Sequence, residues 1–170
     1  MMKRVIMSMV TAALALTLAA CGGSDAGTPG ETAMTKEEML AEGVALEEMD
    51  AVSAAMEEVP DYLFSSDAQL GIYALYMVYE QNPLAFAENY CNRPYRVTGY
   101  VDDIREEGFD LEIEPDIGEN MEFQMPVQLV DPEEMLTLQK GERITVVGIL
   151  KEQEGEDVNY LTVTSAYIAS

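Results

Sequence analysis

The sequence predicts a small β-barrel of five strands that follows a helical segment and a hydrophobic leader. Apolar residues recur every three or four positions between residues 35 and 90, and they alternate with polar residues from residue 95 onward. These two spacings are typical of amphipathic helices and of half-buried strands, respectively. A hydrophobic run that ends at Cys21 precedes both regions. We therefore divide the chain into residues 1–20, 21–34, 35–90 and 91–170.

Residues 1–20 have the composition of a secretory signal peptide, with basic Lys3 and Arg4 followed by an apolar run. The run from Val5 to Ala20 is shorter than the roughly 20 apolar residues that a membrane-spanning helix needs. Its last residues resemble the lipobox of bacterial lipoproteins, in which a cysteine receives lipid and the chain is cut before it: Leu18-Ala19-Ala20-Cys21. This resemblance implies lipid attachment at Cys21, loss of residues 1–20, and a membrane-anchored position in the cell envelope, outside the cytoplasm.

Residues 21–34 are rich in Gly, Ser, Thr and Ala, which predicts a flexible linker. Thr35 and Glu38 form a capping-box pattern, so we expect one amphipathic helix from there to Val59-Pro60. Its apolar face comprises Met39, Leu40, Gly43, Val44, Leu46, Met49, Val52 and Met56. A second helix starts at Ser66 or Asp67 and is interrupted at Asn82-Pro83. Residues 83–90 then form a short helix or a kinked continuation.

The residues after Tyr95 predict five half-buried strands with one short helix between the third and the fourth. The helix begins at Asp131-Pro132, an acidic cap followed by proline, and ends at Lys140-Gly141. Its apolar side is expected to comprise Met135, Leu136 and Leu138. The inward-facing residues of the strands are expected to be Tyr95, Val97, Gly99 and Val101; Phe109, Leu111 and Ile113; Met121, Phe123, Met125, Val127 and Leu129; Ile144, Val146, Gly148 and Leu150; and Leu161, Val163, Ser165 and Tyr167.

This order of elements is that of the OB-fold, a five-stranded Greek-key barrel whose helix lies between strands three and four. Gly99 and Gly148 fall in mid-strand, where a small barrel must bend. Another small barrel or sandwich with one helix is the alternative on pattern alone.

Two segments resemble OB-fold lipoproteins of the tRNA-anticodon-binding-like (tRNA_anti-like) family. Residues 90–101 resemble the family's Y-x-G-K-x-Y-x-V-T-G-x-V entry, with Asn92-Arg93 in place of Gly-Lys. Residues 138–148 resemble its L-x-x-G-D-x-V-T-V-x-G junction. The resemblance covers residues 80–170 well and residues 35–80 loosely. It implies the fold but no activity, and the family's name implies no tRNA binding here.

The chain carries 9 basic and 32 acidic residues, a formal net charge of −23. Such a field repels nucleic acids, whose binding relies on Lys and Arg. The simplest role of the charge is solubility, and attraction of cations or basic partners is the alternative. The chain contains no histidine, which excludes histidine-based triads and histidine zinc sites. If Cys21 is lipidated, Cys91 has no intramolecular disulfide partner, and we expect it to be buried and inert.

OB-folds bind ligands on the face of strands two and three and through the loops after strands one and four. Here that face and those loops, residues 102–108 and 152–159, are acidic, which disfavours nucleic acid. Tyr100 and Tyr160 are candidates for stacking on sugar rings, although packing in the core or at its rim is the favoured explanation. The polar residues of the face are Asp110, Glu112, Glu114, Glu122, Gln124 and Gln128.

We find no catalytic residue set, cofactor motif or metal-ligand spacing in the sequence. The sequence therefore predicts a non-catalytic envelope module that binds a protein, peptide or glycan and is not an enzyme. A structural envelope protein without a specific small ligand is the first alternative. A hydrolase that uses two carboxylates is a distant second.

Overall fold

The computed structural model describes residues 34–63, 66–113, 123–155 and 160–170. Residues 32–170 form one compact unit. The expected signal peptide and Cys21 lie outside the described residues, as do Glu114, Met121 and Glu122. Within the described part of the chain, no helix combines the length and apolar character needed to cross a membrane.

Four α-helices precede the barrel: α1 (Lys36–Glu42), α2 (Asp50–Glu58), α3 (Asp67–Gln81) and α4 (Pro83–Tyr90). Three of them, α1, α3 and α4, begin close to where the capping residues predict. The capping box at the start of α1 is confirmed, because the Glu38 amide donates to Thr35 Oγ1 at 3.3 Å and the Thr35 amide donates to Glu38 Oε2 at 2.9 Å. Asn82 ends α3 and caps α4 with its side chain, so Pro83 begins a separate helix.

The single helix expected from residue 35 to residue 59 is wrong. At Gly43 the backbone becomes extended, and a two-residue strand, β1 (Val44–Ala45), pairs in parallel with Tyr95 and Arg96. A 3₁₀ turn, η1 (Leu46–Glu48), then leads into α2. A Cβ atom at Gly43 would lie 3.0 Å from Val147 Cγ2, so the break brings the chain directly against the barrel. Contacts with the barrel therefore override the helical period.

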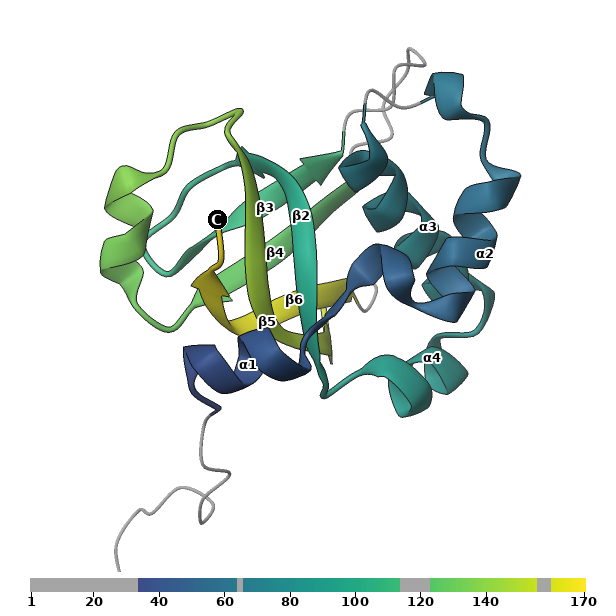
Figure 1. Cartoon of the computed structure of the whole chain (residues 1–170), viewed down its shortest axis with the longest axis horizontal. Helices are drawn as coiled ribbons and strands as arrows, with labels where there is room; N and C mark the ends of the chain where they lie inside the picture. Colours follow the sequence, from purple (N-terminus) through teal and green to yellow (C-terminus); the bar gives the residue numbers. More distant parts are fainter. Residues whose placement is uncertain (1–33, 64–65, 114–122, 156–159) are drawn as a thin grey trace, which may run out of the picture. The chain divides into compact units, whose positions relative to one another are not determined.

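Five strands close into a mixed barrel (Figure 1): β2 (Pro94–Asp102), β3 (Gly108–Ile113), β4 (Phe123–Leu129), β5 (Arg143–Gln153) and β6 (Tyr160–Ile168). Neighbouring strands follow the order β2-β3-β4-β6-β5, and pairing of β5 with β2 closes the circle. Only the β4–β6 pair is parallel within the closed barrel; the other four pairs are antiparallel. The strand β1 lies outside this ring, on β2.

The predicted inward faces of β2 and β3 are confirmed, as are those of β4 at Met125, Val127 and Leu129. The prediction for β6 is wrong after Val163, because Ala166 is fully buried whereas Ser165 and Tyr167 are only half-buried. Ser165 has φ of 51°, and the pairing of β6 with β5 shifts register beside it. This β-bulge inserts one residue and so exchanges the two faces of the strand.

The helices flank the barrel, with α2, α3 and α4 together on one side in Figure 1. Helix α3 packs on β2, β3 and β4, and its Ile72 is fully buried beside Gly99 and Leu111. The segment η3 (Pro132–Thr137), expected as the short helix between strands, is a 3₁₀ helix that buries Met135. Leu136 is exposed rather than on the apolar side, because a 3₁₀ turn of three residues rotates side chains differently from an α-helix.

Candidate functional site

A hollow of about 420 Å³ opens on the outer face of β3 and β4. We call it the β3–β4 hollow. The loop between β2 and β3 rims one side, and the last residue of β5 and the first residue of β6 rim another. Its lining residues are Arg105, Glu106, Glu107 and Gly108 from the loop; Phe109, Asp110, Pro126, Val127 and Gln128 from β3 and β4; and Gln153, Tyr160 and Thr162 from β5 and β6.

Asp110 is the most unusual residue of the hollow, because its carboxylate is on the outer face of β3 and yet only 2% exposed. Its Oδ2 accepts a hydrogen bond from Arg105 Nη2. Its Oδ1 is buried and has no hydrogen-bond partner among the described residues. Burial raises the pKa of Asp110 above the ordinary carboxyl value, and the nearby guanidinium of Arg105 opposes that rise. The sequence-based expectation of an exposed carboxylate at this position is wrong.

Arg105 covers Asp110 from the loop. Its Nε also donates to Asp103 Oδ2 at 3.2 Å, so one guanidinium contacts two carboxylates. The loop turns sharply because Asp103 has φ of 27° and the Arg105 amide donates to the Gly108 carbonyl. A Cβ atom at Gly108 would lie 2.0 Å from the Val127 carbonyl oxygen, so only glycine permits the loop to enter β3 this close to β4. Arg105 is therefore held over the buried carboxylate by local backbone geometry.

The floor of the hollow is polar on the β6 side. Thr162 is 3% exposed, and its hydroxyl donates to the Pro126 carbonyl at 2.9 Å. Asp110 faces Pro126 in the β3–β4 pairing, and it faces Asp102 in the β2–β3 pairing. Polar atoms of β3, β4 and β6 thus lie beside one another in the lining of the hollow.

A second ionic cluster lies beside these residues on β2. Asp102 is 6% exposed, pairs through Oδ1 with Lys140 Nζ, and accepts from Gln124 Nε2 at Oδ2, at 3.2 Å. The hydrogen bond from Lys140 lowers the pKa of Asp102. Asp102 Oδ1 is therefore balanced by the charge of Lys140, as Asp110 Oδ2 is by the charge of Arg105.

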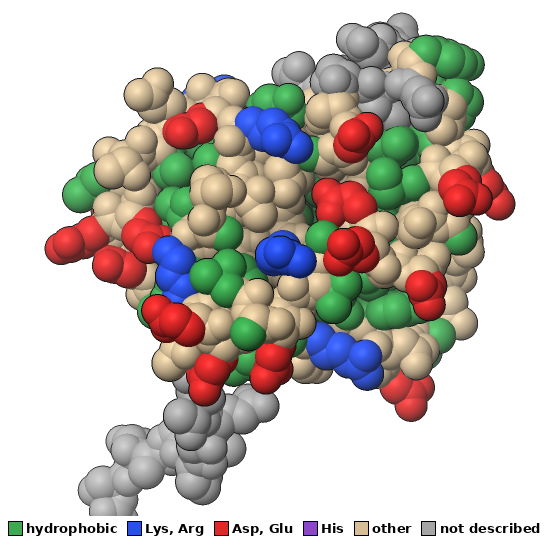
Figure 2. Space-filling view, in the orientation of Figure 1, with side chains coloured by type: hydrophobic (Ala, Val, Ile, Leu, Met, Phe, Trp, Pro, Cys, Tyr) green, Lys and Arg blue, Asp and Glu red, His purple; other side chains and the backbone are tan. Residues whose placement is uncertain are grey.

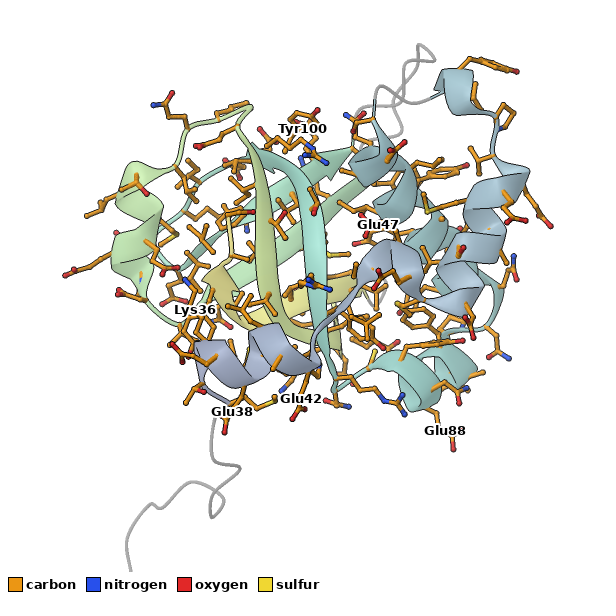
Figure 3. All side chains as sticks on the ribbon, in the orientation of Figure 1. Lys36, Glu38, Glu42, Glu47, Glu88 and Tyr100 are labelled. Atoms are coloured by element: carbon orange, nitrogen blue, oxygen red, sulfur yellow. The ribbon has the colours of Figure 1, made fainter. Side chains whose placement is uncertain are left out.

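The structure gathers part of the predicted groove and separates the rest. Asp110, Gln128, Gln153, Tyr160 and loop residues 105–108 line the hollow. Gln124 belongs to the Asp102 cluster and Glu112 is half-buried near Lys140, so neither lines the hollow. Tyr100 (labelled in Figure 3) pairs with Glu112 in the β2–β3 register and does not line the hollow either. Sequence reasoning missed Thr162 and the contact between Arg105 and Asp110.

The remaining cysteine, Cys91, is free and 7% exposed, and burial raises the pKa of its thiol. Among the described residues, no three His, Cys, Asp or Glu side chains are close enough to hold a metal ion. The described residues that line the hollow supply carboxylate, amide and hydroxyl groups, so it offers hydrogen bonds and negative charge.

A scan against models of protein families finds no match to this chain, and a search of curated proteins finds none either.

Proposed function

We propose that the protein is a lipid-anchored, non-catalytic binding module of the cell envelope, and that the β3–β4 hollow is its ligand site. The observation that carries the proposal is the position of the hollow. In an OB-fold, ligands bind on the face of the second and third strands, between the loops after strands one and four. The hollow lies on β3 and β4, between the β2–β3 loop and the two ends of the β5–β6 connection.

The proposed OB topology is supported by the strand order. Counted from β2, the barrel strands are neighbours in the order one, two, three, five, four, and the first pairs with the fourth. The short helix η3 lies between the third and fourth strands, as the OB-fold requires. Helices α1, α3 and α4 precede the barrel and pack on its strands, and α2 packs on α3, so no helix forms part of the ring.

Charge supports a non-nucleic-acid ligand. Arg105 is the only basic residue of the lining among the described residues, and it faces Glu106, Glu107 and Asp110. Oligonucleotide-binding barrels combine a basic groove with stacking aromatic residues. The proposed ligand is therefore a protein, peptide, glycan or small molecule that tolerates or uses negative charge.

The ligand site is tested by filling the hollow. We expect a thermal-shift screen of amines, amino acids, peptides and oligosaccharides to yield a ligand that raises the Tm of the wild-type protein. The Gln128→Trp variant places an indole in the hollow at an exposed position, so the same ligand should no longer raise the Tm. As a control, Glu88→Trp changes exposed α4 instead (Figure 3). A shift of equal size in wild type and Gln128→Trp would contradict the proposed site.

The anchor is tested separately. The lipobox-like residues that end at Cys21 support lipidation, so Cys21→Ser should release the protein from the membrane fraction and abolish labelling by radioactive palmitate. Cys91→Ser serves as the matched control, because it removes the other sulfur without touching the lipobox. Retention of the Cys21→Ser protein in washed membranes would contradict the anchor.

A further inference from the structure

We propose that the outward face of the β2–β5 ladder docks an extended acidic peptide segment of a partner protein, and that its carboxylates pair with Arg96 and Arg143. No residue of this face lines the β3–β4 hollow, so the inference is independent of the ligand site proposed there. We call this face the arginine row, and it comprises Arg96, Thr98 and Tyr100 of β2 with Arg143 and Thr145 of β5.

Strand pairing sets the length of the arginine row. The strands β2 and β5 run side by side toward the viewer in Figure 1, in teal and yellow-green. Tyr100 pairs with Arg143 at one end of the row, and Arg96 pairs with Val147 at the other. Arg143 and Val147 are four residues apart on β5, which corresponds to about 13 Å along a strand. The two arginines therefore mark the ends of a row of about that length.

Neither arginine of the row has an acidic partner, although the chain carries 32 acidic residues. The ion pairs of the described residues involve other cations, and neither Arg96 nor Arg143 takes part in a hydrogen bond or ring contact there. Glu142 precedes Arg143 but is engaged elsewhere, because its carboxylate accepts from the Gln139 amide at 3.1 Å. The two positive charges are therefore left for a partner.

The guanidinium of Arg96 is held by packing at its inner end and is open at its outer end. A Cβ atom at Gly43 would lie 3.7 Å from Arg96 Cγ, so the stem of the side chain packs where α1 ends. Its Nε is buried, whereas its two unbonded Nη atoms are not, since the residue as a whole is only half-buried. A carboxylate can approach these two Nη atoms and accept a hydrogen bond from each. Arg143 is exposed.

Neutral hydrogen-bond donors lie between the two arginines. The hydroxyl oxygens of Thr98 and Thr145 are 2.9 Å apart, and one hydroxyl donates to the other. This contact uses one of their two protons, so the second is left to donate to a partner. The hydroxyl of Tyr100, which lies opposite Arg143, also has no hydrogen bond among the described residues. The row thus offers donors along its length to the oxygen atoms of an extended peptide.

The charge of the surrounding surface selects the class of partner. Figure 2 shows basic side chains along the course of β2, with acidic side chains on both sides. Nucleic acid carries one negative charge for about every 1.7 Å of duplex, and an anionic membrane is charged over its whole surface. Either would bring phosphates against the carboxylates beside the row. A short peptide with two separate carboxylates contacts the row alone.

The spacing of the arginines matches two acidic residues four positions apart. In an extended chain, residues i and i+4 lie on the same face and about 13 Å from one another. Residues i and i+3 lie on opposite faces, so only one of their carboxylates would reach an arginine. The row therefore favours an extended segment with glutamate or aspartate at positions i and i+4.

The test is fluorescence anisotropy with the purified full chain in non-ionic detergent, at about 0.15 M NaCl to screen weak surface attraction. The probe is a dye-labelled peptide of serine and threonine with two glutamates four positions apart and an amidated end. We expect saturable binding, and absence of binding would overturn the inference. The same peptide with glutamines should not bind. A version with glutamates three positions apart should bind at least about threefold more weakly.

Variants locate the binding on the row. Arg96→Gln should weaken binding by about tenfold, the effect of losing a charge-assisted hydrogen bond, and Arg143→Gln, at an exposed position, by about threefold. As the matched control, Lys36→Gln removes the same charge at the start of α1, where Lys36 pairs with Glu134 (Figure 3), and should alter affinity by less than about twofold. Equal losses in all three variants would mean non-specific attraction, and the inference would be overturned.

Two further measurements separate the alternatives. Arg143→Gln changes an exposed side chain and so keeps the test valid if Arg96→Gln fails to fold. Gln128→Trp fills the β3–β4 hollow and should leave peptide binding unchanged, whereas a loss as large as that of Arg143→Gln would place the peptide in the hollow and overturn the inference. Binding of a labelled single-stranded oligonucleotide in place of the peptide, if Arg143→Gln abolishes it, would show that the row serves nucleic acid and would likewise overturn it.

Discussion

Gly148 lies in β5 opposite the bulge at Ser165 and Ala166, where two strands approach more closely than a side chain allows. A Cβ atom there would lie 2.6 Å from Val163 Cγ1 and 2.9 Å from Ala166 Cβ. Val163 and Ala166 are fully buried, so neither can move aside without disturbing the barrel core. The glycine and the bulge therefore depend on one another.

We expect Gly148→Ala to lower the free energy of unfolding by about 1–3 kcal/mol, the usual cost of overpacking a filled core. Gly141→Asn is the matched control, because Gly141 has φ of 82° and open space around its Cα, and asparagine tolerates this conformation. Urea unfolding of both variants measures the difference. A Gly148→Ala protein as stable as the wild type would contradict the close packing.

The ion pair between Asp102 and Lys140 makes the stability of the fold depend on pH. The hydrogen bond from Lys140 lowers the pKa of Asp102 below its ordinary value of 3.8. A carboxyl group whose pKa is lower in the folded state contributes stability above its ordinary pKa and loses that contribution as pH falls through the folded-state pKa.

We therefore expect Lys140→Met to lower the Tm at pH 7 more than Lys151→Met does. The Lys151→Met control removes an exposed lysine of β5. The gap in Tm between the two variants should narrow as the pH falls from the ordinary carboxyl pKa of 3.8 through the lower pKa that Asp102 has in the folded protein. Scanning calorimetry between pH 2 and pH 7 checks this. A gap that stays constant over the range would show that Lys140 acts through packing alone.

At the scale of elements, the junction of α3 and α4 depends on one side chain. The Asn82 amide donates to the Tyr79 carbonyl and ends α3, and Asn82 Oδ1 accepts from the Ala85 amide at 3.2 Å and begins α4. Phe86 of α4 is then buried against Tyr79, with ring centroids 5.6 Å apart. The cap thus fixes the angle at which α4 packs.

Asn82→Ala removes the cap, and we expect it to lower the free energy of unfolding by about 1 kcal/mol. Asn82→Asp keeps an oxygen acceptor at the same place and should retain most of the stability. Chemical denaturation of the two variants separates the hydrogen bond from other effects of the substitution. Equal destabilisation by both would indicate that the cap oxygen contributes little.

At the scale of the whole molecule, acidic side chains outnumber basic ones, 32 to 9. Figure 2 shows acidic side chains spread across the visible face with fewer basic ones between them. The formal net charge is −23, and such self-repulsion opposes the compact state. Four ion pairs are present among the described residues, and they involve only Lys36, Arg105 and Lys140 as cations.

We expect NaCl to stabilise the protein, because raising it from about 0.01 M to about 0.1 M shortens the Debye length from about 30 Å to about 10 Å. The Tm should therefore rise over this range. Glu88→Lys reduces the net negative charge and should raise the Tm in low salt, with a smaller gain at the higher concentration. A Tm that falls with salt would show that attractive ion pairs outweigh the repulsion.

Local patterns in the sequence are enough to predict where α1, α3 and α4 start, where the barrel strands run, and which residues of β2, β3 and β4 face inward. These features depend on local physics: a side chain that caps the next turn, a proline at a helix start, and apolar residues with a period of two. Lipidation at Cys21 is likewise readable only as a local pattern and stays a prediction.

Tertiary contacts set the break at Gly43, the bulge at Ser165 and the burial of Asp110. Each is set by close contact between segments that the sequence does not relate: Gly43 with Val147, Gly148 with Ala166, and the loop residue Arg105 above the outer face of β3. The alternation of polar and apolar residues in β3 predicts Asp110 at the surface. It is buried because the tight turn before β3 places the guanidinium of Arg105 over it. The hollow exists because backbone geometry, not residue type, brings that loop over β3 and β4.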